Sequence, residues 1–437
     1  MTILTPNSPA TRSEKTNDAV SHDRLPPSYS FDAATGRLEL DTSDPLFVQN
    51  PYPAYADLHK RSGPDGPIVW WDAYGHHVFG GLDTVNALFR NRKLGRQILH
   101  RVSREELGWP PPNPRVADFD AVDAHSLLEL EPPDHTRLRK LIARAFISRQ
   151  IETLGPEIEA EADHAMDRFG ETADLIADYA QPLAGNTIAR MLGIDTAHVP
   201  ALLNWSNAMV RMYAASRNEE VERAANSAAR EFAAFVWDEI EARRRHPGTD
   251  LLSHLLTVQA DSDQLTDTEI VSTTILLLNA GHEATVHAMG NGLRILFQAD
   301  NAMRQTWLAD PQALVEEIVR HAPPLHMFTR YVLEDCELYG LPLRQGDVVG
   351  LHLGMANHDP RRIDNPSAFD PARPRVPHVA FGGGLHVCIG NALAKLEMQI
   401  AISRLFARFP ALAMQGSARF KDAYHFHGLE RLIVTTR

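Results

Sequence analysis

The sequence predicts a mainly α-helical protein with a smaller β region. Helical apolar periodicity dominates residues 132–244, and a second helical pattern begins at residue 265 and continues to about residue 297. Short β-like runs occur at residues 68–71, 77–79 and 347–353. Because no internal repeat and no linker divides residues 51–437, we expect residues 1–30 to form a flexible tail and residues 31–437 to form one domain.

The composition excludes several classes of protein. With 44% hydrophobic residues the chain can bury a sizeable core, and its net charge of −13 argues against general nucleic-acid binding. The two cysteines, Cys336 and Cys388, do not indicate a disulfide framework, which fits a reducing cytoplasm. The polar first residues and the lack of a long apolar run predict neither a signal peptide nor a membrane anchor.

The first third of the chain alternates short helices with short strands. Tyr55 and Leu58 lie at helical spacing after the prolines at positions 51 and 53, and residues 82–89 are again helical. Residues 109–123 contain four prolines and little periodicity, so we expect a long loop there. Loops of this length often act as lids or walls of binding sites.

A capping box marks the start of the longest predicted helix. Thr266 and Glu269 have the spacing in which each side chain bonds the backbone N–H of the other. Further along, Gly281 costs about 1 kcal/mol relative to alanine in a helix interior, so it needs a packing or functional reason. Glu283 stands in an apolar stretch, and we interpret it as either an ion-pair partner or a proton carrier.

The spacing of two histidines on this helix argues against a zinc site. His282 and His287 flank Glu283, as in the zinc-protease pattern, but they are five residues apart rather than four. Five residues place two side chains roughly 140° apart around a helix. The two histidines therefore do not favour one shared ion.

Cys388 lies in the most informative stretch of the sequence. Residues 381–390 read FGGGLHVCIG and precede a helical pattern. Glycines permit tight turns and close approach of a flat ligand, and a helix N-terminus favours a thiolate. This combination indicates a haem iron with an axial cysteine, whereas a lone cysteine is more often a small buried residue.

The same stretch resembles the haem-binding signature of the cytochrome P-450 superfamily. Its specified positions are matched by Phe381, Gly382, Gly384, His386, Cys388 and Gly390. The resemblance extends from about residue 51 to the C-terminus and is to the soluble bacterial type. It implies a single-domain cytochrome P-450 fold, in which haem b lies between a long central helix and the helix that follows the cysteine loop.

The central helix resembles the oxygen-activating segment of that family, with one departure. Ala280, Gly281, Glu283 and Thr285 match the family pattern, but Ala284 stands where the family usually has a threonine that organises water and protons. The resemblance implies catalytic roles for Gly281, Glu283, Ala284 and Thr285. We expect an ordered water, Thr285, Asn279 or a substrate hydroxyl to replace the missing hydroxyl.

Further residues match positions that surround the haem, or support the fold near it, in that family. His135 and Arg139, four apart on one helix face, together with Arg330 and His386, match the partners of the haem propionates. Glu317 and Arg320 resemble a structural Glu-x-x-Arg pair of the family, which we expect to bind Arg373. Cys336 lies in a strand-like run, and we interpret it as inert.

The resemblance implies a haem-thiolate monooxygenase that oxidises a small to medium apolar organic substrate with dioxygen. Because the sequence has no flavin, dinucleotide or iron–sulfur motif, electrons are expected from a separate ferredoxin and its reductase. Arg137, Lys140 and Arg144 are candidates for steering an acidic ferredoxin, although a solvated helix face explains them equally well. Two alternatives remain, a peroxygenase that uses hydrogen peroxide and a non-catalytic haem sensor or electron carrier.

Family position also implies the walls of the substrate pocket. They include the loop before Asp134 and residues 203–212. Mostly apolar walls are typical of small-molecule pockets, and the possible polar anchors are Asn279, His326 and His425. The individual residues expected in the pocket are Asn279, Ala280, Leu325, His326, Phe328 and Phe426.

Overall fold

The computed structural model describes residues 24–146, 151–213, 217–262, 265–424 and 426–436. Most of the expected N-terminal tail, residues 1–23, lies outside the described residues. The part that is described is bonded to the body of the protein. The Ser28 N–H donates to Asp44, and the Tyr29 hydroxyl donates to Asp57 at 2.6 Å.

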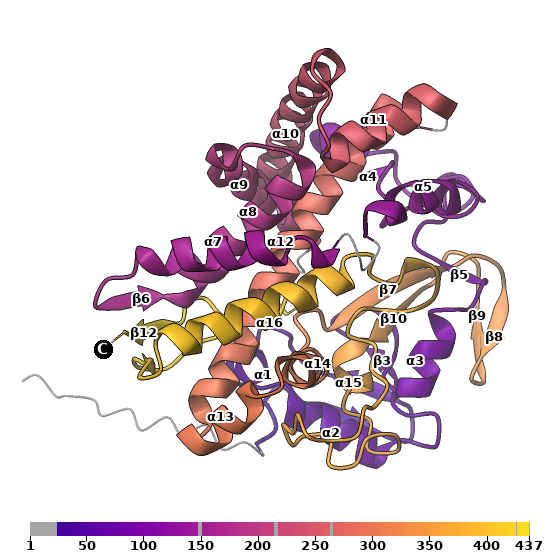
Figure 1. Cartoon of the computed structure of the whole chain (residues 1–437). Helices are drawn as coiled ribbons and strands as arrows, with labels where there is room; N and C mark the ends of the chain where they lie inside the picture. The colour runs from indigo at the N-terminus through magenta and orange to yellow at the C-terminus, as the bar shows by residue number, and fades with distance from the viewer. Residues whose placement is uncertain (1–23, 147–150, 214–216, 263–264, 425, 437) are drawn as a thin grey trace, which may run out of the picture.

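Helices make up most of the fold (Figure 1). In the first half of the chain they are α1 Pro45–Gln49, α2 Tyr52–Arg61, α3 Leu82–Leu88, η1 Pro114–Val116, α4 Ala117–Asp123, α5 Asp134–Ile142, η2 Ala143–Phe146, α7 Gly155–Asp167, η3 Leu175–Ala180, α8 Gln181–Leu192, η4 Thr196–His198, α9 Val199–Val210 and η5 Arg211–Tyr213. In the second half they are α10 Glu219–Arg245, α11 Leu251–Ser262, α12 Asp267–Gln298, α13 Asn301–Leu308, α14 Pro311–His321, α15 Leu353–Ala356, η6 Gly384–His386 and α16 Asn391–Arg408.

The strands form a smaller β region beside these helices. They are β1 Ser30–Asp32, β2 Arg37–Glu39, β3 Ile68–Trp71, β4 His76–Phe79, β5 Leu94–Gly95, β6 Thr172–Asp174, β7 Met327–Val332, β8 Cys336–Leu338, β9 Leu341–Leu343, β10 Val348–His352, β11 Ala413–Met414 and β12 Ile433–Thr435. Seven of them form one sheet in the order β1-β2-β3-β4-β10-β7-β5. In this sheet β4 and β10 are parallel, whereas β10 and β7 are antiparallel, with Gly350 opposite Thr329. The prediction of a mainly α protein with a smaller β region is confirmed.

Helix α12 runs through the middle of the helical part and carries the largest share of the core. Thr266 and Glu269 form the predicted capping box at its N-terminus. Its glycines allow neighbouring helices to approach closely, since a Cβ on Gly292 would lie 2.6 Å from Ile318 of α14. Helix α16 packs against α7 and α14 and also contacts α12. The two helices α12 and α16 cross near the centre of the molecule (Figure 1).

The expected loop at residues 109–123 is wrong for its second half, which forms η1 and α4. Asn113 caps η1 by accepting the N–H of Arg115, and Asn226 of α10 accepts the N–H groups of Asp118 and Phe119 at the start of α4. These bonds come from a helix about a hundred residues away. Tertiary contact therefore forms a helix that local periodicity does not indicate.

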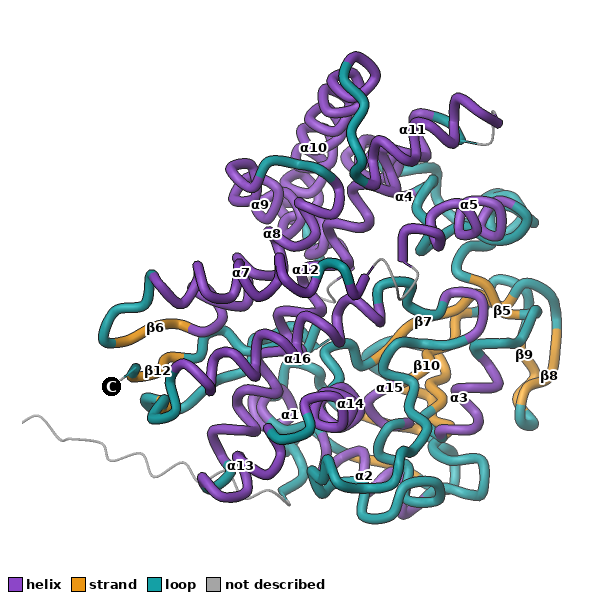
Figure 2. The backbone as a smooth tube through the Cα atoms, in the orientation of Figure 1, coloured by secondary structure: helices purple, strands orange, loops and turns teal. Residues whose placement is uncertain are grey.

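Residues 357–383 connect α15 to the cysteine stretch without a helix or strand, and Figure 2 shows this loop-rich path. The backbone is nevertheless tied down, since the N–H of Val379 donates to Asn357 at 2.8 Å. Within the described ranges, no helix combines the length and the apolar character needed to cross a membrane.

Candidate active site

A cavity of about 500 Å³ lies between α12 and the cysteine stretch. The middle of α12 forms one wall, and residues 386–390 with the start of α16 form the opposite wall. Mostly apolar side chains from α4, α5, α8 and β7 close the remaining sides. A volume of this size suits a drug-sized organic ligand or a cofactor.

The cysteine stretch folds as a tight loop that ends at α16. Gly382 and Gly384 have φ angles of +67° and +64°, which favour glycine. A Cβ on Gly384 would lie 2.0 Å from the carbonyl oxygen of Phe89, so no side chain fits there. The N–H of Cys388 donates to the carbonyl oxygen of Phe381 at 2.9 Å. This bond closes the loop and fixes the cysteine at the cavity wall.

Cys388 faces the cavity, which it lines together with Phe381, His386 and Gly390. Burial raises the pKa of the Cys388 thiol above its ordinary value, and the Gly390 N–H with the Arg139 and Lys395 cations offset this effect only in part. The Gly390 N–H, at the N-terminus of α16, thus acts in the direction expected for the thiolate, but burial outweighs it. Deprotonation of Cys388 needs a stronger partner, and a metal cation is the usual one.

Two histidines meet at one edge of the cavity. His135 of α5 is fully buried, and neither of its ring nitrogens has a hydrogen-bond partner among the described residues. Its ring lies 4.5 Å from the ring of His386, whose Nε2 is 3.3 Å from the Glu131 carboxylate. Burial, followed by the neighbouring His386 and Arg139, lowers the pKa of His135 to about 4.

Three arginines surround the same edge. Arg139 donates to the carbonyl oxygen of Val387 at 2.7 Å, next to the cysteine. The buried Arg330 stacks over the Phe89 ring, and burial with the neighbouring Arg96 lowers its pKa to about 9. The edge therefore combines the cations Arg139 and Arg330 with the ring nitrogens of two histidines, a set of hydrogen-bond donors that fits a ligand with carboxylates.

The expected catalytic residues lie together on α12, opposite the cysteine loop. Gly281, Glu283, Ala284 and Thr285 all line the cavity. The Thr285 hydroxyl donates to the Gly281 carbonyl oxygen at 3.0 Å, one turn back along its own helix. Gly281 has a packing reason, because a Cβ there would lie 3.2 Å from Ile188 of α8. Glu283 accepts a hydrogen bond from His287 at 3.0 Å.

The structure brings most of the expected pocket residues together. Asn279, Ala280, Leu325, Phe328 and Phe426 line the cavity, whereas His326 does not. Instead His326 is fully buried with its Nδ1 2.7 Å from the Tyr55 hydroxyl, so its placement in the pocket is wrong. His425 lies outside the described residues. Asn279 lines the cavity, and its buried side-chain oxygen has no hydrogen-bond partner in the described part of the chain.

Comparison with known proteins identifies the family. The family model described as "Cytochrome P450" matches residues 311–429. A biotin biosynthesis cytochrome P450 of Bacillus subtilis (strain 168) is 35% identical over 400 residues, which cover 90% of this chain and 98% of that protein. The chain belongs to the cytochrome P450 family.

Other P450s share the whole architecture. The 6-deoxyerythronolide B hydroxylase of Saccharopolyspora erythraea is 33% identical over 371 residues, covering 83% of this chain and 89% of that protein. The crystal structure of P450BioI in complex with an acyl carrier protein ligated with hexadec-9Z-enoic acid matches with a TM-score of 0.81 at 32% identity. That match covers 89% of this chain and 99% of the other chain. The protein is accordingly a P450 monooxygenase.

The residues of this P450 fit the haem that its family implies. Both ring nitrogens of the buried His135 and the Nδ1 of His386 have no partner among the described residues, and such buried polar atoms fit a ligand that carries carboxylates, as haem does. Gly390 lines the cavity, and a Cβ on it would meet no atom within 4 Å. The cavity wall around Cys388 is therefore open to close approach by a flat ligand.

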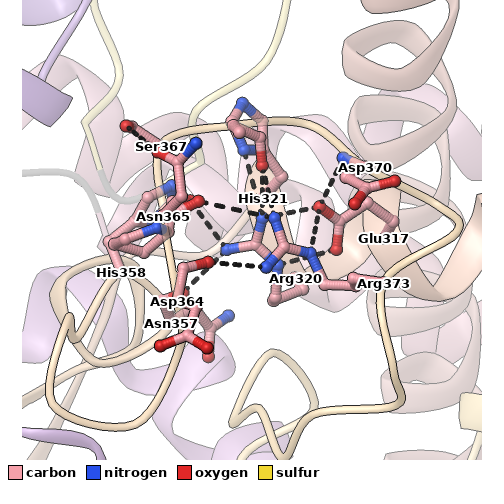
Figure 3. A network of polar contacts seen from close by, with 12 residues as sticks. Glu317, Arg320, His321, Asn357, His358, Asp364, Asn365, Ser367, Asp370 and Arg373 are labelled. Carbon is pink, nitrogen blue, oxygen red and sulfur yellow. Dashed lines mark hydrogen bonds and ion pairs between the residues drawn. The ribbon is translucent and has the colours of Figure 1, made fainter.

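A polar network joins α14 to the loop-rich stretch before the cysteine (Figure 3). Glu317 accepts hydrogen bonds from Arg320 and, at 3.0 Å, from Arg373, and the N–H of Asp370 donates to the same carboxylate. Arg320 also donates to the carbonyl oxygens of Asn357 and Pro366. The structure thus brings the three expected residues together, and we propose a structural role for them.

The cavity has a polar end whose residues no pattern in the sequence predicts. Asp123 of α4 accepts a hydrogen bond from the Tyr213 hydroxyl at 3.1 Å, and both residues line the cavity with Arg96. Arg96 is bonded to Glu129 and to two backbone carbonyl oxygens. Burial, followed by the Glu129 charge, raises the pKa of Asp123 to about 7. These residues come from four separate segments, and no spacing in the sequence links them.

Proposed function

We propose that the protein is a haem-thiolate monooxygenase in which Cys388 binds the iron of haem b. The single observation that carries this proposal is the position of Cys388, which faces Glu283 and Ala284 of α12 across one cavity. When bound, thiolate-ligated haem supplies the iron that activates dioxygen. We propose His135, Arg139, Arg330 and His386 as propionate partners, and Phe381, Gly382 and Gly390 as the walls of the haem pocket.

The chain's own residues then have three tasks. The arginines and histidines at the cavity edge neutralise and orient the carboxylates of the cofactor. The apolar walls exclude water and hold an organic substrate over α12. Glu283 moves protons toward the cavity, while Ala284 leaves the place of a hydroxyl to an ordered water or to the substrate.

The substrate is a small to medium, mainly apolar organic molecule. The substrate carries a polar group that binds Asn279, because the buried side-chain oxygen of Asn279 accepts no other hydrogen bond in the described part of the chain. The related P450BioI was crystallised with an acyl carrier protein that bears a fatty acid. In this chain Arg96 is already bonded to Glu129, which makes the cavity a poor site for a free carboxylate.

We propose that electrons come from a ferredoxin and its reductase in the cytoplasm. Lys140 of α5 is exposed beside the cysteine side of the molecule, whereas Arg137 is bonded to Asp134 and Glu269. The side chain of Arg144 lies outside the described part. Lys140 is thus the better supported of the three cations for steering an acidic partner.

The test compares two sources of oxidising equivalents. Holoprotein is screened against organic compounds for the absorption change caused by loss of iron-bound water, and the best ligand is then incubated with ferredoxin, reductase and dioxygen. We expect an oxidised product that requires all three components. Equal product formation from hydrogen peroxide without redox proteins would identify a peroxygenase instead, and the absence of any ligand response would favour a sensor.

A further inference from the structure

Glu283 is held by a histidine that belongs to the same helix. The Nε2 of His287 lies 3.0 Å from Oε1 of Glu283, one helical turn away, and the Nδ1 of His282 lies 3.8 Å from Oε2. Glu283 lines the cavity, whereas neither histidine does. His287 therefore bonds the carboxylate from behind the cavity wall.

The ring of His287 is fixed in place. It is 1% exposed, and a Cβ on Gly428 would lie 2.0 Å from its Nδ1, so only a glycine fits against the ring. With the ring fixed in this way, Nε2 is the nitrogen that faces the carboxylate. Nδ1 has no hydrogen-bond partner within the described ranges.

The charges around this pair favour the anion of Glu283. Burial raises the pKa of Glu283, but the hydrogen bond from His287 and the charges of His287, His282 and Lys421 outweigh it and lower the pKa to about 2. The described titratable groups facing the pair are His282 on α12 and Lys421 and His427 on the C-terminal segment. Burial, above all, lowers the pKa of both His282 and His427 to about 4.

An ionised Glu283 cannot donate a proton until it receives one. Ala284 has no hydroxyl, and the hydroxyl of Thr285 is bonded to the Gly281 carbonyl oxygen. Among the described residues, His287 is the side chain that makes a hydrogen bond to the Glu283 carboxylate. His287 is therefore the described side chain that orients this carboxylate.

We propose that His287 is a positioning residue that holds the Glu283 carboxylate at the cavity wall, in the orientation needed where a hydroxyl at position 284 is missing. His287 donates its Nε2–H to Oε1 of Glu283 and keeps this proton. Each proton that the carboxylate takes up from water it releases into the cavity, so Glu283 returns to its anion and His287 is unchanged. This inference rests on the monooxygenase function proposed above.

Two substitutions separate positioning from proton transfer. His287→Gln keeps an N–H donor for the carboxylate but cannot ionise, whereas His287→Leu removes the donor. His282→Gln is the control, since His282 lies farther from Glu283 and makes no hydrogen bond to it. Correct folding of each holoprotein is checked by its ferrous–carbonyl spectrum.

The first readout is the infrared carboxyl band of Glu283, assigned by its loss in Glu283→Gln, and it is independent of turnover. We expect the pKa of Glu283 to rise in His287→Leu and to stay low in His287→Gln and His282→Gln. An unchanged pKa in His287→Leu overturns the proposal.

The second readout is the fraction of reducing equivalents that reaches product between pH 6 and pH 9. We expect His287→Leu to lose roughly tenfold to a hundredfold, and His287→Gln, which keeps an N–H donor for the carboxylate, to stay close to the wild type. A wild-type fraction in His287→Leu, or an equal loss in His287→Gln, overturns the proposal. If the wild type itself forms no product, the proposed function fails, while the infrared result still decides whether His287 controls Glu283.

Discussion

Arg320 holds Glu317 with two parallel hydrogen bonds of 2.7 Å, from Nε to Oε2 and from Nη2 to Oε1, and both side chains are almost completely buried. Bidentate geometry of this kind is the strongest form of an arginine–carboxylate pair. The pair anchors the path of residues 357–373 to α14, because Arg320 and Glu317 also bond the backbone there. The cysteine loop follows directly on this stretch.

Breaking this pair will destabilise the protein and weaken haem retention. Arg320→Leu leaves the Glu317 charge buried without its main partner, which costs about 3 to 5 kcal/mol of the free energy of unfolding. Urea denaturation and the ratio of haem to protein measure the two effects. Arg375→Leu is the control, since Arg375 is 86% exposed and lies 3.7 Å from Glu316. Equal stability of the two variants would contradict a structural role for the pair.

A hydroxyl at position 284 will change how efficiently electrons are used. Ala284→Thr and Ala284→Val add nearly the same volume to the cavity wall, so the difference between them isolates the hydroxyl. We expect the fraction of reducing equivalents that reaches product to differ between these variants by about tenfold. Product and consumed reductant are measured together. Identical fractions in both variants and the wild type would argue against a specialised relay at this site.

The buried Glu397 of α16 will make stability fall as the pH rises. Burial raises its pKa from 4.5 to about 8, so the folded state keeps a proton that the unfolded state releases. Stability is therefore lost between pH 4.5 and pH 8, and the cost at pH 7 is about 3 kcal/mol. Denaturant unfolding of Glu397→Gln against the wild type across this range measures the difference. A constant difference from pH 5 to pH 8 would show that Glu397 does not titrate in this way.

Asp123 will control the binding of cationic ligands. Its pKa of about 7 means that the polar end of the cavity gains a negative charge as the pH rises through neutrality. A quaternary ammonium ligand, whose own charge does not change, should bind more tightly at pH 8 than at pH 6. Asp123→Asn should abolish this dependence, and Asp118→Asn, on the same helix but half exposed, should keep it. Spectral titration of the holoprotein gives both affinities, and pH-independent binding to the wild type would contradict the prediction.

Local patterns in the sequence predicted the elements that local chemistry determines. The capping box of Thr266 and Glu269 marks the start of α12, and the β-like run at residues 347–353 predicts β10 to within a residue at each end. Residues 109–123 were mispredicted because Asn226, from a distant helix, caps α4. His326 was misplaced because it is fully buried against Tyr55, whose hydroxyl lies 2.7 Å from its Nδ1, and no local pattern marks a contact between residues so far apart in the sequence.

The residues of the site were predictable from sequence only where they lie within one short motif. The glycine-rich stretch around Cys388 and the segment around Glu283 each lie within a few residues, so their chemistry is visible in sequence. Asp123, Tyr213 and Arg96 meet only through packing of separate segments, and nothing in their local sequence marks them. His287 was noticed as a metal ligand to reject, whereas its hydrogen bond to Glu283 follows from the helical turn between them.

The central claim is that Cys388 ligates a haem iron. The most direct measurement is the ferrous–carbonyl absorption spectrum of the holoprotein, compared with Cys388→Ala and with Cys336→Ala as the matched control. We predict the red-shifted band of sulfur ligation in the wild type and in Cys336→Ala, and its loss in Cys388→Ala. A wild-type spectrum without that band, or the same spectrum after Cys388→Ala, would contradict the account.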